Sequence, residues 1–93
     1  MERIKSACIK YQLKSDPGTD RYVEGSSHAD CISWFSAADL YIRDRVPEEE
    51  VQGFMTTEGR FIDRIEAYRI ADEAGQLTHS RRDQVLYSEF CIY

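Results

Sequence analysis

The chain has 93 residues, enough for one small hydrophobic core, so we expect residues 1–93 to form a single domain. Its 17 acidic and 12 basic residues give a net charge of −5, which argues against electrostatic binding to duplex nucleic acid or to an anionic membrane. No stretch approaches the roughly 18 apolar residues of a membrane span and no signal peptide is apparent, so we expect a cytoplasmic protein.

The first expected elements form a hairpin. Apolar residues occupy alternate positions from Ala7 to Leu13, which is the period of a half-buried strand. The segment 15–18 favours a turn, because its proline fixes φ and its glycine accepts positive φ. We expect residues 21–24 to return as the second strand.

A helix is expected next, from about His28 to Asp44. Ser27 and Asp30 have the spacing of a capping box, with aspartate in place of glutamate. The apolar residues that follow have the spacing of an amphipathic helix and comprise Cys31, Trp34, Phe35, Ala38, Tyr41 and Ile42. Leu40 falls opposite the centre of that stripe, so part of the helix is expected to meet another subunit. Together with six tyrosines, which are common at interfaces, this predicts a homo-oligomer.

The second half of the chain predicts another hairpin and another helix. Residues 52–57 and 60–62 are expected to be strands, joined by a two-residue turn at 58–59. Asp63 and Glu66 form a capping box that begins the helix, and Gly75 lies where a helix commonly ends.

The segment 85–93 is rich in β-branched and aromatic residues, so we expect a last strand or an extended tail. The resulting order, β-β-α-β-β-α-β, predicts an α+β fold. In that fold a small antiparallel sheet carries two helices on one face.

The search for catalytic and metal-binding motifs favours a binding protein over an enzyme. Neither His28 nor His79 lies in a hydrolase or zinc motif, and no nucleotide-hydrolysing loop is present. The three cysteines are odd in number and lack CxxC spacing, so they are expected to be reduced thiols. We therefore expect no catalytic residues, no metal and no cofactor.

The segment from Thr56 to Arg64 is the first candidate anion site. It brings the hydroxyls of Thr56 and Thr57 and the guanidinium groups of Arg60 and Arg64 to the start of a helix, where free amides favour a phosphate. The alternative is that a carboxylate of the same chain, such as Glu58 or one from the acidic run 48–50, occupies these arginines.

Other candidates lie outside that segment. His28 stands at the start of the first helix, where it either faces an anion or simply neighbours the cap. Arg81 and Arg82 form a second basic spot, and Phe61, Tyr22 or Tyr87 could stack on a nucleobase.

The stretch 53–76 resembles a family of small phage and prophage proteins. The shared pattern is Gly-Phe-x-Thr-x-x-Gly-Arg-Phe-x-x-Arg-x-Glu-Ala-x-x-Ile-Ala-x-x-Ala-Gly-Gln. It is matched here by Gly53, Phe54, Thr56, Gly59, Arg60, Phe61, Arg64, Glu66, Ala67, Ile70, Ala71, Ala74, Gly75 and Gln76. Weaker similarity extends to His28-Ala29-Asp30 and to residues 86–89.

Within this family, the chain is similar to the phage sponges called Thoeris anti-defence one. The resemblance implies an oligomer in the host cytoplasm that sequesters a cyclic ADP-ribose isomer, or a cyclic oligonucleotide of the CBASS type, without cleaving it. A single histidine stands in the segment 27–30, where a pair is expected in many relatives.

Two functions remain open from the sequence. The first is an anti-defence sponge that holds a small nucleotide signal, as the cluster of arginines and hydroxyls favours. The alternative is an acidic phage protein that inhibits a host protein by direct binding, as the net charge and the acidic run 48–50 favour.

Overall fold

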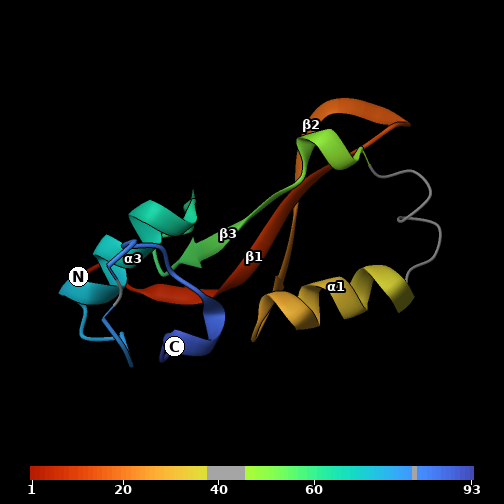
Figure 1. The fold of residues 1–93 in the computed structure, drawn as a ribbon. Helices are drawn as coiled ribbons and strands as arrows, with labels where there is room; N and C mark the ends of the chain where they lie inside the picture. The colour runs from red at the N-terminus through yellow and green to blue at the C-terminus, as the bar shows by residue number, and fades with distance from the viewer. Residues whose placement is uncertain (38–45, 81) are drawn as a thin grey trace.

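The computed structural model describes residues 1–37, 46–80 and 82–93. Two long strands, β1 (Ile4–Leu13) and β2 (Asp16–Gly25), precede helix α1 (His28–Ala37). A 3-10 turn, η1 (Pro47–Glu49), leads into β3 (Val51–Thr56), β4 (Phe61–Ile62) and helix α3 (Arg64–Glu73). A second 3-10 turn, η2 (Ser88–Phe90), lies near the C-terminus (Figure 1).

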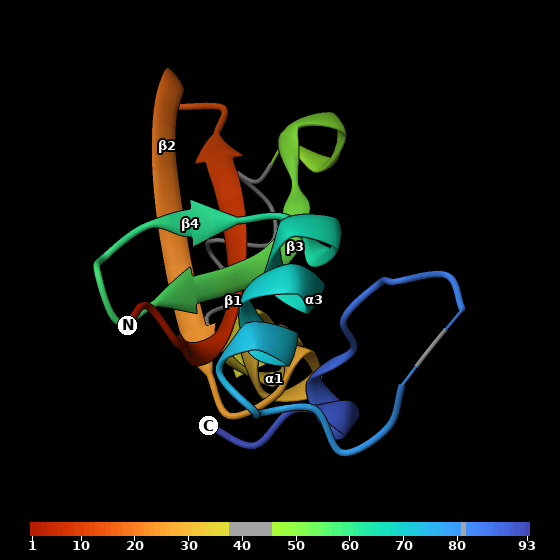
Figure 2. The ribbon, with the colours of Figure 1, turned by 90° about the vertical axis from the view of Figure 1, so that its left-hand side faces the viewer.

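The strands form one antiparallel sheet in the order β2-β1-β3-β4. The sheet is strongly twisted, so β3 and β4 cross the direction of β1 and β2 (Figure 2). The predicted α+β class, with an antiparallel sheet and two helices, is therefore confirmed. The predicted order of elements is wrong at its last member.

That last member, residues 85–93, forms no strand of the sheet. Its backbone bonds to the segment around α3 instead, through Leu86 N to Arg64 O at 2.9 Å and Ile92 N to Gln76 O at 2.8 Å. A single bridge joins Leu77 and Cys91. The polar groups of this segment are thus satisfied without a sheet edge, although its composition favours a strand.

The first hairpin turns earlier than expected. Leu13 pairs with Asp16, so the chain reverses at residues 14–15 and β2 already includes Pro17 and Gly18. Proline is tolerated because β2 is an edge strand, and Gly18 adopts a φ of +86° there. The second turn is also longer than predicted: Thr56 N bonds to Arg60 O at 2.9 Å, and Gly59 adopts a φ of +77°.

The helix starts agree with their capping signals. Ser27 Oγ accepts a hydrogen bond from Asp30 N at 3.1 Å at the start of α1. Asp63 accepts one from Glu66 N at 2.8 Å at the start of α3, and Gly75 follows that helix with a φ of +70°. The predicted extension of the first helix from residue 38 to Asp44, including Leu40, lies outside the described residues.

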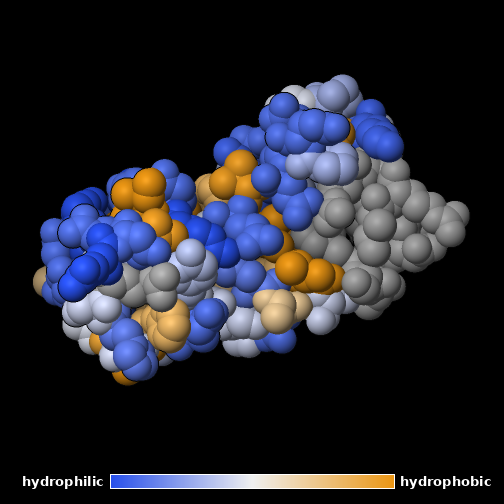
Figure 3. Space-filling view, in the orientation of Figure 1, coloured by the Kyte–Doolittle hydropathy of each residue, from blue (hydrophilic) through white to orange (hydrophobic). Residues whose placement is uncertain are grey.

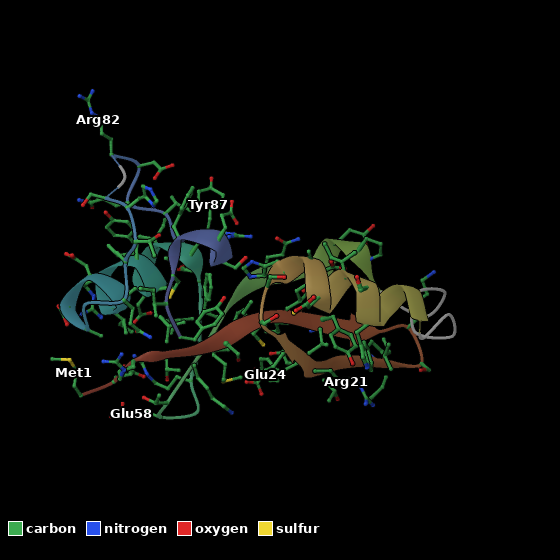
Figure 4. All side chains as sticks on the ribbon, turned by 90° about the horizontal axis from the view of Figure 1, so that it is seen from below. Met1, Arg21, Glu24, Glu58, Arg82 and Tyr87 are labelled. Atoms are coloured by element: carbon green, nitrogen blue, oxygen red, sulfur yellow. The ribbon has the colours of Figure 1, made fainter. Side chains whose placement is uncertain are left out.

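Both helices cover the same face of the sheet. The α1 helix contacts β1 and β2, and α3 contacts β3 and β1, so the two helices lie in a row over one side of the strands (Figure 4). Two hydrophobic clusters fill the layer between. The α3-side core contains Ile4, Ala7, Phe54, Ile62, Ala67, Tyr68, Ile70, Ala71 and Leu86. The hairpin-side core contains Ile9, Tyr11, Leu13, Val23 and Cys31.

Gln76 joins both ends of the chain to the α3-side core. Its buried side-chain amide accepts from Ile4 N at 2.8 Å and donates to Ile4 O and Ile92 O, each at 2.9 Å. The amide thereby bonds to the backbone of β1 as a residue of a neighbouring strand would. Without it, buried backbone N–H and C=O groups would lack hydrogen-bond partners, which costs stability.

Candidate functional site

Two aromatic residues that the sequence names as candidates for base stacking come together on the sheet face away from the helices. Tyr22 of β2 lies beside Lys10 of β1 in the strand register, and Phe61 of β4 extends across β3 toward both. The ring centroids of Tyr22 and Phe61 are 5.6 Å apart with an interplanar angle of 45°. The Lys10 ammonium lies 5.5 Å from the Phe61 ring centroid. We call Lys10, Tyr22 and Phe61 the sheet-face cluster.

Gly53 makes this cluster possible. A Cβ atom at Gly53 would lie 2.2 Å from the carbonyl oxygen of Ile62 and 2.7 Å from the Phe61 ring. Any larger residue would therefore push Phe61 away from the sheet and strain the pairing of β3 with β4. The glycine of the Gly-Phe motif allows a side chain from one edge of the sheet to lie over its centre.

The sheet-face cluster offers an exposed ring beside a cation. The Tyr22 side chain is 46% exposed, and Phe61 and Lys10 are partly exposed. Lys10 forms no ion pair with a carboxylate in the described ranges, whereas the neighbouring Lys5 pairs with Glu24 at 3.4 Å. Figure 4 shows Glu24 on this same side of the strands, away from the helices. An aromatic face and an available ammonium are the groups that bind a nucleobase and a phosphate.

The polar side chains of the hairpin tip, those of Thr56, Thr57 and Arg60, already bind groups of the same chain. Arg60 donates two hydrogen bonds to the Glu2 carboxylate, at 2.6 and 2.8 Å, and Thr56 Oγ1 donates a third at 2.6 Å. Arg60 first, and then Thr56, lower the pKa of Glu2 to about 2. Thr57 Oγ1 accepts from Arg3 N at 3.0 Å. The intramolecular alternative therefore applies to Arg60, with Glu2 as the carboxylate instead of Glu58 or the run 48–50.

Arg64, His28 and Tyr87 form a second group, on the helix side of the sheet. The Arg64 guanidinium donates to Leu86 O at 2.8 Å and to Gln52 Oε1 at 2.7 Å, and it lies 5.2 Å from the Tyr87 ring centroid. Its Nη2 is also 3.3 Å from His28 Nδ1. Arg64 thus joins the start of α3 to β3, α1 and the C-terminal segment, which is a structural role.

His28 is held as a neutral ring in this group. Its Nε2 lies 2.7 Å from the Gly53 carbonyl, which can only accept, so Nε2 carries the proton and Nδ1 accepts from Arg64. Burial, and to a lesser degree the Arg64 charge, lower the pKa of His28 despite its bond to Gly53. His28 therefore links elements inside the protein and does not face an anion. We call His28, Arg64 and Tyr87 the His28 joint.

The basic loop contributes little to either group. Arg81 lies outside the described residues, and Arg82 is exposed at the end of the loop, well away from Tyr87 (Figure 4). Of the ten candidate residues, the structure places two in the sheet-face cluster, and three around the His28 joint. The other described candidates are Thr56, Thr57 and Arg60 at the hairpin tip, and Arg82 in the loop.

Three residues of these groups were missed by sequence reasoning. Lys10 occupies an outward position in the alternation of β1, which is a signal that could have placed it on the open face. Gly53 belongs to the family pattern, but its close contact with Phe61 becomes visible only in three dimensions. Glu2 lies 58 positions from Arg60, and no local sequence pattern indicates so distant a partner.

The described part of the chain holds neither a cluster of metal ligands nor a helix that could span a membrane. Within residues 1–37, 46–80 and 82–93, no three histidine, cysteine or acidic side chains gather as metal ligands would. No helix in those ranges is long and apolar enough to span a bilayer.

Comparison with known proteins identifies the family. The family described as phage T4 y16D protein matches residues 3–91, nearly the whole chain. The chain therefore belongs to the phage T4 y16D protein family, and the predicted origin in a family of small phage proteins is confirmed. No curated protein and no solved structure matches it significantly.

Proposed function

We propose that this member of the phage T4 y16D family is an anti-defence binding protein that sequesters a cyclic nucleotide signal in the host cytoplasm without cleaving it. The signal would be a cyclic ADP-ribose isomer or a cyclic oligonucleotide. The observation that carries the proposal is the sheet-face cluster, in which Tyr22 and Phe61 meet from distant strands beside the ammonium of Lys10.

In this proposal the base stacks on the exposed Tyr22 ring and Lys10 meets a phosphate. Base stacking on an aromatic side chain contributes about 1–3 kcal/mol, and a hydrogen bond to a charged group about 1.5–3 kcal/mol. Lys10 takes the role first expected of Arg60 and Arg64, because those two guanidinium groups already bind partners within the chain. A ligand would have to displace Glu2 before it could bind Arg60.

A second copy of the chain would enclose the ligand in this proposal. One exposed ring and one ammonium cannot surround a nucleotide, and tight sequestration with a dissociation constant near nanomolar corresponds to about −12 kcal/mol. Support for self-association comes from α1, where Ile32 and Trp34 are 46% and 42% exposed.

The test is calorimetric titration of cyclic ADP-ribose isomers and cyclic oligonucleotides into the wild type and two variants, Tyr22→Leu and Lys10→Gln. Each variant removes one ligand-binding group from an exposed position, so each should weaken binding about tenfold or more while the protein stays folded. Tyr93→Leu and Lys14→Gln are matched controls at exposed positions outside the cluster.

The same sample decides between sequestration and turnover. Bound material is released by heat denaturation and identified by mass spectrometry, and intact ligand is the expected result. A linearised or hydrolysed product would make the protein an enzyme. Unchanged affinity in both variants would remove the sheet-face cluster from the proposal.

The alternative function, inhibition of a host protein by direct binding, is favoured by one observation. The 3-10 turn η1 presents Glu48 and Glu49 to solvent in a chain of net charge −5. If none of the nucleotides is retained, this alternative becomes the leading one.

A further inference from the structure

A groove of about 510 Å³ runs along α3 on the helix side of the molecule. The helix contributes Ile65 and Tyr68 as apolar lining, and Gln84 from the following loop lines it as well. Ile65 is 67% exposed, so most of its aliphatic side chain is open to contact from outside the chain. In Figure 3 hydrophobic atoms emerge over α3 within a hydrophilic surface. None of the sheet-face cluster lines this groove.

The groove carries an excess of negative charge. Three carboxylates line it, those of Asp63, Glu66 and Asp72, against one guanidinium, that of Arg69. Arg69 is already shared between Glu66 at 3.6 Å and Glu73 at 3.3 Å. Asp72 is exposed and forms no ion pair with the described part of the chain.

The apolar and acidic groups have a regular spacing. Ile65 and Asp72 are two helical turns apart, so they point to the same side of α3 about 10 Å from each other along the axis. An extended peptide in the polyproline II conformation rises about 9 Å in three residues and returns its side chains to the same side at every third position. An apolar side chain on Ile65 and a basic side chain at Asp72 therefore fit one extended segment.

We propose that this groove docks a basic, partly apolar segment of a partner protein, with an aliphatic side chain against Ile65 and an arginine or lysine at Asp72. Charge complementarity selects this occupant, since an acidic groove repels nucleotides and acidic peptides. The surface is distinct from the sheet-face cluster, so the protein could hold a nucleotide and a partner protein at the same time.

The probe is a short acetylated and amidated peptide of serine and glycine with leucine and arginine three positions apart. It is titrated into isotopically labelled protein and followed by amide NMR shifts. We expect the shifts to concentrate in α3 and at Gln84, to spare Tyr22, and to weaken as salt is added. A peptide with glutamate in place of arginine should cause none of them.

Two variants test the contacts without threatening the fold, because both residues are exposed. Asp72→Asn should weaken peptide binding about threefold to fivefold, the scale of a partly exposed ion pair. Ile65→Ser should weaken it about tenfold through lost apolar contact. Glu48→Gln, which removes an exposed carboxylate of η1 outside the groove, is the matched control and should leave affinity unchanged.

Several outcomes would overturn the proposal. Equal shifts from the glutamate peptide would deny charge selection, and the absence of shifts at millimolar peptide would deny the site. Shifts of the α3 amides with protein concentration alone would mean that a second copy of the chain occupies the groove. A failure here leaves the nucleotide titrations untouched, because they depend on the opposite face of the sheet.

Discussion

His28 Nε2 lies 2.7 Å from the carbonyl oxygen of Gly53, while a Cβ atom at Gly53 would lie 2.7 Å from the Phe61 ring. One residue of β3 thus contacts the buried joint on the helix side of the sheet and the exposed cluster on the other side. The hydrogen bond of His28 and the space under Phe61 therefore depend on the same residue.

The stability of the protein should fall as the pH drops below about 6.5. The pKa of His28 in the folded protein is lower than its ordinary value of 6.5, so between the two values the unfolded chain binds more protons. Stability is then fully present above 6.5 and is lost as the pH falls toward the folded pKa. Urea denaturation at a series of pH values measures it, with His28→Gln expected to flatten the profile in this range.

His79 provides the matched control for that measurement, because it is exposed on a loop. His79→Gln should leave the profile near pH 6 unchanged. The pKa of the Glu2 carboxylate is about 2 in the folded protein against an ordinary 4.5. Its titration therefore changes stability only below about pH 4.5 and does not affect the measurement near pH 6. An unaltered profile in His28→Gln would contradict the proposed joint.

Gly53→Ala should destabilise the protein by about 3 kcal/mol. The added methyl group meets the Ile62 carbonyl at 2.2 Å, and backbone cannot move aside as cheaply as a side chain can. Removing the Phe61 ring as well, in Gly53→Ala/Phe61→Ala, should not restore stability, since the backbone clash remains. Chemical denaturation gives both values, and a near-wild-type single variant would refute the close approach.

Arg60→Ala and Arg64→Ala should have different effects on stability. The Arg60 side chain is 48% exposed, so solvent screens its pair with Glu2 and loss of the pair should change stability little. Arg64 is partly buried and bonds to the carbonyl of the buried Leu86, so its loss should cost about 3 kcal/mol. Thermal melts of the two variants measure the difference, and equal, small losses would show that the C-terminal segment is held by other contacts.

Self-association should be visible by light scattering on a sizing column. The expected mass is a multiple of the 10.8 kDa chain, because Ile32 and Trp34 leave apolar surface on α1. Trp34→Ser should shift the equilibrium toward the monomer, while Ile65→Ser on α3 should not. A clean monomer at micromolar concentration would remove the second copy from the proposed nucleotide site.

Local signals in the sequence predicted the helix starts and most strands, because they depend on neighbouring residues. The Asp63 cap and the Gly75 terminus of α3 agree with the structure for this reason. The last segment was predicted as a strand or an extended tail from its composition alone, whereas its tertiary hydrogen bonds to Arg64 and Gln76 decide its conformation.

The candidate site was harder to predict than the fold. The sequence suggested Tyr22 and Phe61 separately as stacking residues, but their meeting depends on the strand order and on the space above Gly53. Arg60 and Thr56 looked available for a phosphate, because their partner Glu2 comes from the far end of the chain. Sequence spacing cannot reveal contacts of that range.

The two cores share β1, which places Ala7 in the α3-side core and Ile9 in the hairpin-side core. The two cores should therefore form at different times during folding. The β1–β2 hairpin is local and can form early, whereas β3 must return from beyond α1 to pair Ala7 with Phe54. Closing that long loop is slow compared with forming the hairpin. In the interval β1 presents an unpaired edge, the kind of surface through which refolding chains aggregate.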